Sequence, residues 1–503
     1  MSRSLLYETN LSDNIQGAAA MPSIPREAIM DTVPRSALAA TKKIVNIVPI
    51  SSNVAGPNQT VQFLIPQRNL AKAHSVYLKF NLGITASAND YSFSGSMASA
   101  ASLINNINIQ AGGVVVESLQ NYHLWHNNVL SMAHQGSDEL NVEALCSGAK
   151  LPFSGIGQYS TVNIAAAAGT LKYSQQQSGY TNNGITAGVA SNPIGAGFVG
   201  VNSSIQQFTG TTGLSTFFSI PIHCGFFNSK EAQLIPLQFI NGGVLVTIQT
   251  NPTSKAFFEN GALISNYTMS NMELCYAEIT PSPEYILRVR EEMIGGKMIK
   301  IEAQSYQQYN ISCGPSVRQI FNVNLSSLSA IFWGRVINQD ANNTSKCFQG
   351  YNADGDPNVR YEVYFDNVLL FNSSEQLNSM AIQVRQLQEA LASSVTDYVI
   401  SPFTTGRGNI TALGDGDAGG ATSSTRNTFF TENFLFGLST KLFASNSTSM
   451  DGTPVGTITV NFSTPNLTSP AALVSQASSI WYMYMVYDYI YLVDATGSVS
   501  KNQ

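Results

Sequence analysis

The stretch GGVLVTIQTNPTS, residues 242–254, has the pattern of a β-strand that ends at a turn. Every second residue of the strand is apolar, as in a strand with one buried face, until an Asn-Pro pair ends the run. A second stretch, VGTITVNFSTPNLTS at residues 455–469, repeats the pattern and ends at a Thr-Pro pair. The alternating apolar residues are Val244, Val246 and Ile248 in the first stretch and Ile458, Val460 and Phe462 in the second. The repetition indicates that the chain contains one kind of β-domain twice.

The order of the other segments supports this duplication. Each half of the chain has early strands, a strand that leads into a helix, a long Gly-rich segment, further strands and one last strand. The expected strands lie at residues 61–66, 75–84, 103–110, 215–222, 234–240, 242–250 and 269–279, and then at 297–303, 320–325, 361–367, 434–443, 456–462 and 481–493. Many short strands without a βαβ rhythm predict an antiparallel sandwich or barrel in each half, and a doubled jelly roll is the preferred interpretation.

Three segments have helical spacing. Residues 117–134 place apolar side chains three and four positions apart, and residues 373–394 do the same after a capping box at Ser373 and Gln376. Residues 282–296 predict a short helix between the halves, because Ser282 can cap it, Pro283 suits its first turn and two glycines follow it.

The composition limits the function classes. The 503 residues are 44% hydrophobic but only 11% charged, against roughly 25% charged in typical soluble domains. Uncharged polar residues cost less to desolvate than ions, so such a surface suits a protein that buries much of its exterior against copies of itself. A secreted β-protein with an uncharged polar surface is the plainer alternative. The net charge of −6 and the nearly neutral first 50 residues argue against nucleic-acid binding.

The cysteines and the N-terminus bear on the compartment. Five dispersed cysteines without a C-x-x-C pair are typical of reduced, buried thiols, which fits assembly inside a cell. The first residues show no basic segment followed by an apolar run, so we expect no signal peptide. No apolar segment approaches the roughly 20 residues of a transmembrane helix.

Histidines provide one candidate metal site. His123 and His126 share a helix face in the expected helix, and could bind a transition metal if other segments supplied further ligands. His134 would lie about 12 Å along the axis from His126, too far to reach the same ion. Polar histidines at a subunit contact are the favoured interpretation of this helix face. A two-domain cupin is excluded, because the chain has five histidines and no His-x-His pair.

Aspartates in Gly-rich turns provide a second candidate, for calcium. These residues are Asp354, Asp356, Asp415 and Asp417. Asp and Gly are also common turn formers, and neither cluster has the distal Glu of an EF-hand loop. Five tyrosines at residues 482–491 could stack on a sugar or a base, but their strand spacing favours a core role. Nucleophile-elbow, P-loop and Rossmann motifs are absent, so we expect neither enzymatic activity nor a cofactor.

The chain resembles the double jelly-roll major capsid proteins of the tectivirus–adenovirus lineage, above all those of virophages and Polinton-like viruses. Residues 55–82 resemble the entry strands of the first jelly roll, and residues 102–125 resemble its strand, Gly-Gly turn and helix. Residues 233–254 and 267–286 resemble its end. The resemblance is a pattern of strands, turns and helices over residues 45–495, without one diagnostic motif.

The resemblance implies an all-β fold of two consecutive eight-stranded antiparallel jelly rolls with short helices and long Gly-rich insertions. The expected parts are an N-terminal arm (1–44), a first jelly roll (45–281), a linker helix (282–296), a second jelly roll (297–495) and a C-terminal tail (496–503). Three copies would form a pseudo-hexagonal capsomer of an icosahedral virion shell, assembled inside the host cell. The Gly-rich insertions at 151–216 and 404–428 would clasp neighbouring copies.

The implied partners are the chain itself, neighbouring capsomers, penton proteins and minor capsid or cement proteins. An internal membrane is a further candidate partner, and direct sequence-specific binding of nucleic acid is not expected. Two alternatives stay open at this point. One is a secreted carbohydrate-binding β-sandwich, and the other is a capsid protein with a single jelly roll and long insertions.

Overall fold

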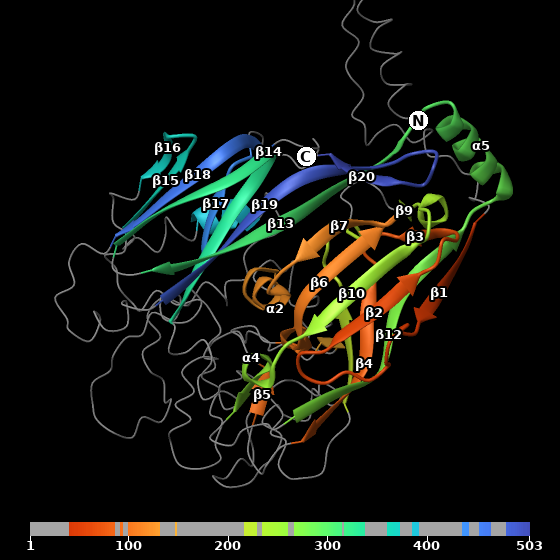
Figure 1. Ribbon diagram of the computed structural model, residues 1–503, viewed down its shortest axis with the longest axis horizontal. Helices are drawn as coiled ribbons and strands as arrows, with labels where there is room; N and C mark the ends of the chain where they lie inside the picture. Colours follow the sequence, from red (N-terminus) through yellow and green to blue (C-terminus); the bar gives the residue numbers. More distant parts are fainter. Residues whose placement is uncertain are drawn as a thin grey trace, which may run out of the picture.

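The computed structural model contains two β-sandwiches joined by one helix (Figure 1). It describes residues 40–85, 91–93, 99–130, 146–147, 216–228, 234–259, 266–313, 316–337, 360–372, 385–391, 435–441, 452–463 and 479–502. Every strand pair in these ranges is antiparallel. Within them, no helix is long and apolar enough to span a bilayer.

The first sandwich has two main sheets. One has the order β8-β4-β12-β3-β9, and β1 pairs with the free side of β12. The other has the order β2-β10-β6-β7. The strands are β1 (Thr41–Ile47), β2 (Thr60–Ile65), β3 (Leu70–Lys72), β4 (Tyr77–Thr85), β6 (Ile104–Ala111), β7 (Val114–Leu119), β8 (Thr216–Pro221), β9 (Leu234–Ile235), β10 (Val244–Thr250) and β12 (Asn266–Thr280), with a separate ribbon of β5 (Tyr91–Phe93) and β11 (Phe257–Glu259).

The second sandwich is built around one very long strand. β14 (Ser316–Ile337) pairs with β18 through its first half and with β19 and β17 through its second half, with register shifts where it passes from one to the other. The sheet order is β13-β19-β14-β18-β15-β16, and β20 pairs with β19. The strands are β13 (Ile299–Cys313), β15 (Arg360–Phe365), β16 (Val368–Asn372), β17 (Phe436–Ser439), β18 (Thr453–Ser463), β19 (Ser479–Val493) and β20 (Val499–Asn502).

The two sandwiches have the same topology. The first contains β1, β2, β4, β6, β7, β8, β10 and β12 in chain order, and the second contains β13, the two halves of β14, β15, β16, β17, β18 and β19. Numbered 1 to 8, these strands form sheets of order 1-8-3-6 and 2-7-4-5 in both sandwiches. Eight antiparallel strands in two such sheets make a jelly roll, so the predicted fold of two consecutive jelly rolls is confirmed. The single-roll alternative is wrong.

The alternation in the sequence explains the sheets. In β10, Val244, Val246 and Ile248 are fully buried while the residues between them are half-buried. β2 and β4 bury every second side chain in the same way, as predicted. β18, the counterpart of β10, buries Ile458 and Val460. The duplicated strand of the opening stretch therefore occupies the same place in each roll.

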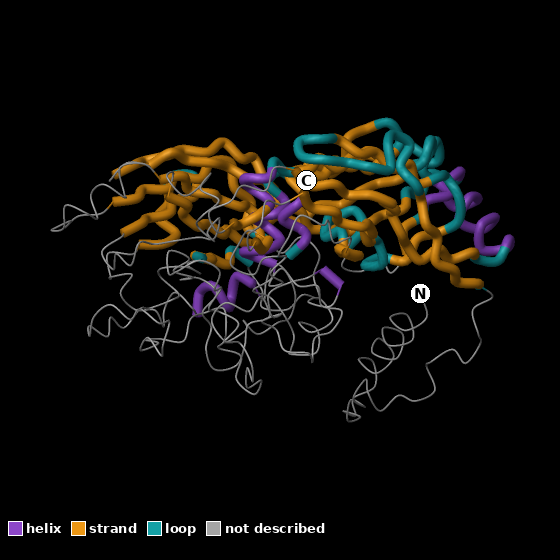
Figure 2. Tube along the Cα trace, turned by 90° about the horizontal axis from the view of Figure 1, so that it is seen from below, coloured by secondary structure: helices purple, strands orange, loops and turns teal. Residues whose placement is uncertain are grey.

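The linker helix α5 (Pro283–Ile294) is confirmed in its details. The Ser282 hydroxyl accepts a hydrogen bond from the Tyr285 amide, and Gly296 follows the helix with a left-handed φ of 88°. The helix lies at the end of the first roll that is remote from the second (Figures 1 and 2), and β13 runs back from it toward the second roll.

Of the other two predicted helices, the one at residues 117–134 differs from the structure. Residues 117–119 of the expected 117–134 helix belong to β7. The helical part that the structure describes consists of α2 (Tyr122–Leu124) and a π-helical turn, η4 (Trp125–Val129), and residues 131–134 lie outside the described residues. The alternation of β7 beside β6 outweighs the helical spacing there. Of the expected helix at 373–394, the structure describes residues 385–391, which are helical and bury Leu387 and Leu391. Short elements complete the first roll: η3 (Ala100–Leu103), η8 (Leu237–Phe239) and α4 (Thr253–Ala256).

Both ends of the described chain carry strands. β1 begins at Thr41, inside the segment predicted as the arm, and β20 at Val499 lies inside the predicted tail. The Gly-rich insertions at 151–216 and 404–428 lie outside the described residues, apart from Thr216 at the start of β8.

Candidate functional site

An aromatic cluster joins the two jelly rolls. Trp125, on the turn after β7 of the first roll, stacks on Tyr306 of β13 with ring centroids 4.5 Å apart. The same indole packs against Tyr484 and Phe332 of the second roll, at 5.2 and 6.0 Å. All four side chains are buried. Large aromatic rings that interdigitate in this way hold two units at a fixed angle, because any rotation would open a void.

A buried carboxylate crosses the same junction. Glu117 on β7 accepts hydrogen bonds from the Gly225 amide at 2.9 Å, from the Phe226 amide at 3.0 Å and from the Ser305 hydroxyl of the second roll at 2.5 Å. Burial raises the pKa of Glu117, although these three hydrogen bonds act in the opposite direction. The carboxylate therefore connects three segments, namely β7, β13 and the loop that follows β8. The loss of its hydration opposes this stabilisation.

Lys501 on β20 is the cation that faces Glu117. Its ammonium group donates to the Tyr487 hydroxyl at 2.8 Å and lies 4.3 Å from the centre of the Tyr489 ring. Burial lowers the pKa of Lys501, and the charge of Glu117 raises it. Burial also raises the pKa values of Tyr489 and Tyr491, which keeps both phenols neutral beside the carboxylate. These tyrosines belong to the core, as their strand spacing predicts, and with Tyr484 and Tyr487 they are buried.

The turn between β19 and β20 docks into the first roll. The Gly497 carbonyl accepts a hydrogen bond from the Asn241 amide at 2.9 Å. A Cβ on Gly497 would lie 2.7 Å from that amide nitrogen, and a Cβ on Gly112 would lie 3.0 Å from the Gly497 carbonyl oxygen. Close approach of three backbones thus requires glycine at both positions, each with a positive φ. β20 thereby fastens the end of the second roll to the first.

Two further hydrogen bonds complete this contact. The Tyr491 hydroxyl donates to the Val116 carbonyl at 3.3 Å, and the Asn121 side-chain amide donates to Gln308 at 2.7 Å. We call the contact the intrachain junction. On the first roll it consists of β7 with the turns before and after it, the loop 222–228 and the turn at Asn241. On the second it consists of β13, β19 and β20 with the turn between them, and Phe332 of β14.

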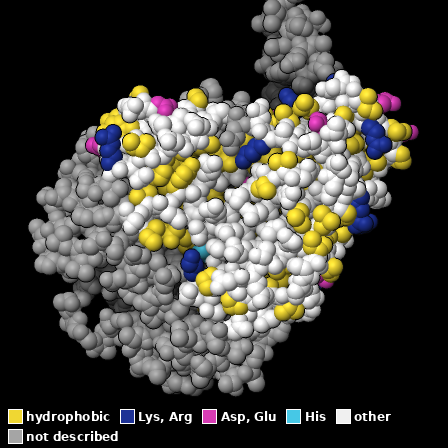
Figure 3. Space-filling view, viewed as in Figure 1, with side chains coloured by type: hydrophobic (Ala, Val, Ile, Leu, Met, Phe, Trp, Pro, Cys, Tyr) yellow, Lys and Arg dark blue, Asp and Glu magenta, His cyan; other side chains and the backbone are white. Residues whose placement is uncertain are grey.

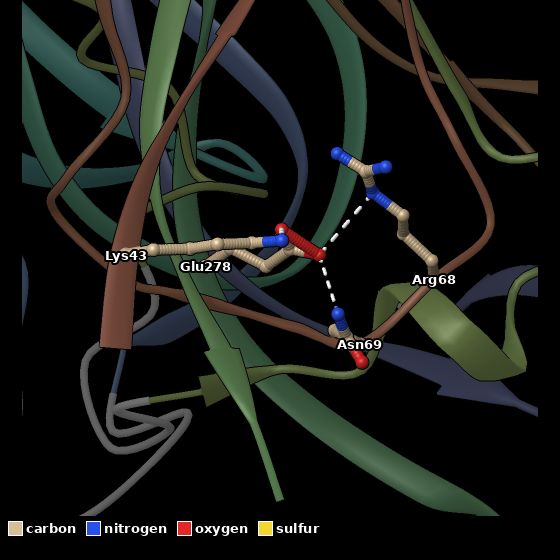
Figure 4. A network of polar contacts seen from close by, with 4 residues as sticks. All are labelled: Lys43, Arg68, Asn69 and Glu278. Carbon is tan, nitrogen blue, oxygen red and sulfur yellow. Dashed lines mark hydrogen bonds and ion pairs between the residues drawn. The ribbon is translucent and has the colours of Figure 1, made fainter. Parts of the chain in front are cut away.

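A second buried carboxylate anchors β1. Glu278 on β12 has a fully buried side chain that contacts Lys43 of β1 at 3.2 Å and Arg68 at 3.2 Å (Figure 4). The Asn69 side-chain amide donates to the same carboxylate at 2.6 Å. Lys43 and Arg68 are about half exposed, so their charges keep much of their hydration while they neutralise the carboxylate. The network holds β1 and the segment after β2 to the middle of the sheet.

The predicted metal-binding histidines are buried beside the junction. His123 and His126 are both buried, which differs from the expected polar helix face. His126 Nδ1 lies 3.2 Å from the Asn127 side-chain oxygen, and its ring centre is 5.6 Å from that of His223. Among the described residues, no group of three or more His, Cys, Asp and Glu side chains could hold a metal ion. A metal at His123 and His126 therefore stays a prediction.

Other candidate residues lie where the structure gives no description. The calcium candidates Asp354, Asp356, Asp415 and Asp417 are outside the described residues, and so is His134. Cys224 and Cys275 are buried free thiols, as expected, and Cys146 is a half-buried free thiol.

The sequence analysis did not predict that Glu117, Ser305, Gly497 and Lys501 lie together where the two rolls meet. The one available signal was Glu117 itself, the only charged residue in the otherwise apolar or uncharged run VVVESL. A charge inside a strand of this kind needs a buried partner or an exit to solvent.

No protein-family model and no curated protein matches the sequence. Solved structures do match the fold. The PBCV-1 VP54 chain fitted into a reconstruction of the virophage Sputnik has a TM-score of 0.56 at 10% identity, over 94% of this chain and 98% of that one. The Faustovirus major capsid protein has a TM-score of 0.52 at 8% identity, over 97% and 98%. The mavirus major capsid protein has 0.52 at 11%, over 96% and 94%. Over nearly its whole length, the chain therefore has the double jelly-roll fold of these viral major capsid proteins.

Proposed function

We propose that this chain is a viral major capsid protein with a structural, non-enzymatic role. Three copies would form a pseudo-hexagonal capsomer, and capsomers would tile an icosahedral virion shell. Two similar rolls in each of three chains give near-sixfold symmetry, which suits the packing of a flat facet. The observation that carries the proposal is the duplicated topology, with both rolls fastened at the intrachain junction.

The outer face of the sheet β2-β10-β6-β7 supports burial against other copies. Its outward residues alternate with the buried ones, and none of those described is charged. They are Thr60, Gln62, Leu64, Leu245, Thr247, Gln249, Asn106, Asn108, Gln110, Val115 and Ser118. Figure 3 shows the same character on a broader scale, with charged side chains sparse among uncharged ones. A face without ions is cheap to desolvate, and its amides and hydroxyls can form hydrogen bonds with a neighbour.

The remaining partners and the location follow from this proposal. Neighbouring capsomers, penton proteins, minor capsid or cement proteins and an internal membrane are the candidate partners of the assembled shell. The segment before residue 40 and the Gly-rich insertions are the candidate ties to them. The protein would be found in the virion after assembly inside the host cell.

A carbohydrate-binding β-sandwich is less well supported. That function needs an exposed aromatic platform, and the tyrosine-rich strand β19 buries Tyr484, Tyr487, Tyr489 and Tyr491. These residues form part of the junction and of the second core instead.

The test is the solution mass of the purified full chain by light scattering, with negative-stain images of the same fraction. We expect a trimer with a six-lobed outline. A chain that stays monomeric at high concentration would contradict the capsomer proposal and direct attention to glycan binding.

A further inference from the structure

One turn of the first roll carries a chemically labile pair of residues at the place where the second roll docks. The sequence contains three Asn-Gly pairs, and Asn241-Gly242 is the one that lies within the described residues. A glycine has no side chain to shield its amide nitrogen, so in such a pair that nitrogen can approach the side-chain amide carbon of the asparagine. Both residues are exposed to solvent. The pair therefore has the composition and the access to water that cyclisation of an asparagine requires.

The turn leaves the Gly242 amide outside its own hydrogen bond. The Ile240 carbonyl accepts a hydrogen bond from the Gly243 amide at 3.2 Å, so Asn241 and Gly242 are the two central residues of a β-turn. Gly242 has a φ of 73°, and beyond its chain neighbours no atom lies within 4 Å of the position that its Cβ would occupy. The nitrogen of Gly242 thus belongs to an open part of the turn.

The backbone of Asn241 is at the same time part of the intrachain junction. Its amide donates to the Gly497 carbonyl at 2.9 Å, and a Cβ on Gly497 would lie 2.9 Å from the Cβ of Asn241. Packing this close leaves no room for additional atoms between the two turns. A longer backbone at Asn241 would therefore separate this turn from the second roll.

We propose that Asn241 is a site of spontaneous deamidation, with water as the co-reactant, and that the modified turn weakens the intrachain junction. The Gly242 amide gives up its proton to solvent base, and its nitrogen attacks the side-chain amide carbon of Asn241. An N–C bond forms, the bond from that carbon to the NH2 group breaks, and ammonia leaves behind a cyclic succinimide. Water then opens the ring at either carbonyl, which yields aspartate or isoaspartate without oxidation or reduction.

Each product disturbs the contact with Gly497 in its own way. In isoaspartate the backbone runs through the side chain of residue 241, which lengthens the chain there by a methylene group. In aspartate the backbone is unchanged, but a carboxylate replaces the amide beside the turn that carries Asp494. Hydrogen bonds from Thr496 and Ser498 lower the pKa of Asp494, so this carboxylate is anionic at neutral pH and repels a second one.

The reaction is irreversible because the ammonia is lost to solvent. In a virion shell of the kind proposed above, no new synthesis replaces modified chains, so the junctions would weaken with the age of the particle. This consequence rests on the proposed function, whereas the deamidation itself depends only on the folded chain.

The test follows one tryptic peptide while the folded full chain is incubated in mildly alkaline buffer. Trypsin releases residues 231–255 as a single peptide, which contains Asn241 and Asn251. Asn251 is an internal control, because it is fully buried and the following Pro252 has no amide proton to lose. We expect mass spectrometry to show exchange of NH2 for OH at residue 241 alone, in two forms that separate by chromatography.

A matched variant connects the modification to the junction. Asn241→Gln keeps a neutral amide on a longer side chain that cyclises more slowly, and circular dichroism checks that the variant is folded. In urea unfolding we expect the midpoint of the parent chain to fall as product accumulates and that of Asn241→Gln to stay constant through the same incubation. The parent before and after incubation provides both measurements even where the variant does not fold.

The contrary outcomes are equally specific. An unmodified peptide from the folded chain, under conditions where the same chain unfolded in urea reacts at Asn241, would overturn the proposal because the turn would then protect the pair. Product at residue 241 with an unchanged urea midpoint would overturn the effect on the junction. An equal fall of the midpoint in folded Asn241→Gln would place the damage elsewhere and would also count against it.

Discussion

The Glu117 carboxylate and the Ser305 hydroxyl form a buried hydrogen bond of 2.5 Å between two jelly rolls, although the residues are 188 positions apart in the chain. The bond sits beside the stacked rings of Trp125 and Tyr306. Polar and aromatic contacts thus join β13 both to β7 and to the turn that follows β7. The two rolls are expected to behave mechanically as one body.

Removal of the Trp125 ring should uncouple the rolls. Trp125→Ala leaves a cavity among Tyr306, Tyr484 and Phe332, and a loss of about 3–5 kcal/mol in unfolding free energy is usual for such a truncation. We expect calorimetry to resolve two transitions in the variant where the parent shows one. Phe80→Ala, a truncation inside the first core, is the control and should lower the transition temperature without splitting the peak.

Glu117 should give the junction a characteristic pH dependence. Its pKa is raised in the folded protein by burial, so its contribution to stability is greatest below its unfolded pKa, near 4.5, and is lost as the pH rises through the folded pKa. Glu117→Gln removes this titration. Urea unfolding from pH 4 to 8 should therefore show the variant gaining stability relative to the parent as the pH rises. A constant difference across this range would show that Glu117 does not titrate as proposed.

Alanine substitutions at Gly497 and at Gly242 give a matched test and control for the packing of the turn between β19 and β20. Both have a positive φ, 79° and 73°, so alanine costs roughly 1–2 kcal/mol at either position from backbone strain. Only at Gly497 would the new Cβ meet other atoms, 2.7 Å from the Asn241 amide nitrogen, whereas nothing lies within 4 Å at Gly242. We expect Gly497→Ala to be clearly the more destabilising of the two in urea unfolding. Equal losses would mean that the turn does not pack against the first roll.

Loss of the Glu278 charge should release β1. In Glu278→Gln, Lys43 and Arg68 lose their buried partner, but both are half exposed and can be hydrated, so the cost should fall below the roughly 3–5 kcal/mol of a fully buried pair. Hydrogen exchange should become faster over residues 41–47. Glu292→Gln, which weakens the exposed pairs with Arg288 and Lys297 at α5, is the control and should change stability by less than about 1 kcal/mol.

Local sequence patterns predicted the elements that depend on local interactions. The alternation in β2, β4 and β10, the Ser282 cap of α5 and the repeated strand at residues 455–469 all follow from near neighbours in the chain. The duplication was visible because each roll must bury one face of each strand in the same order. The helical spacing at residues 117–119 gave a wrong prediction, because the pairing of β7 with β6 outweighs that spacing.

By itself, then, the sequence determined that the chain is a duplicated antiparallel β-protein with a helix between its halves, since periodicity and capping are local properties. Only the tertiary structure decided which polar residues meet. Strand pairing brings Glu278 to Lys43, and the packing of one roll against the other brings Glu117 to Ser305 and Gly497 to Asn241, each over more than 180 positions. No local pattern encodes such contacts, because their partners are selected by the packing of whole sheets.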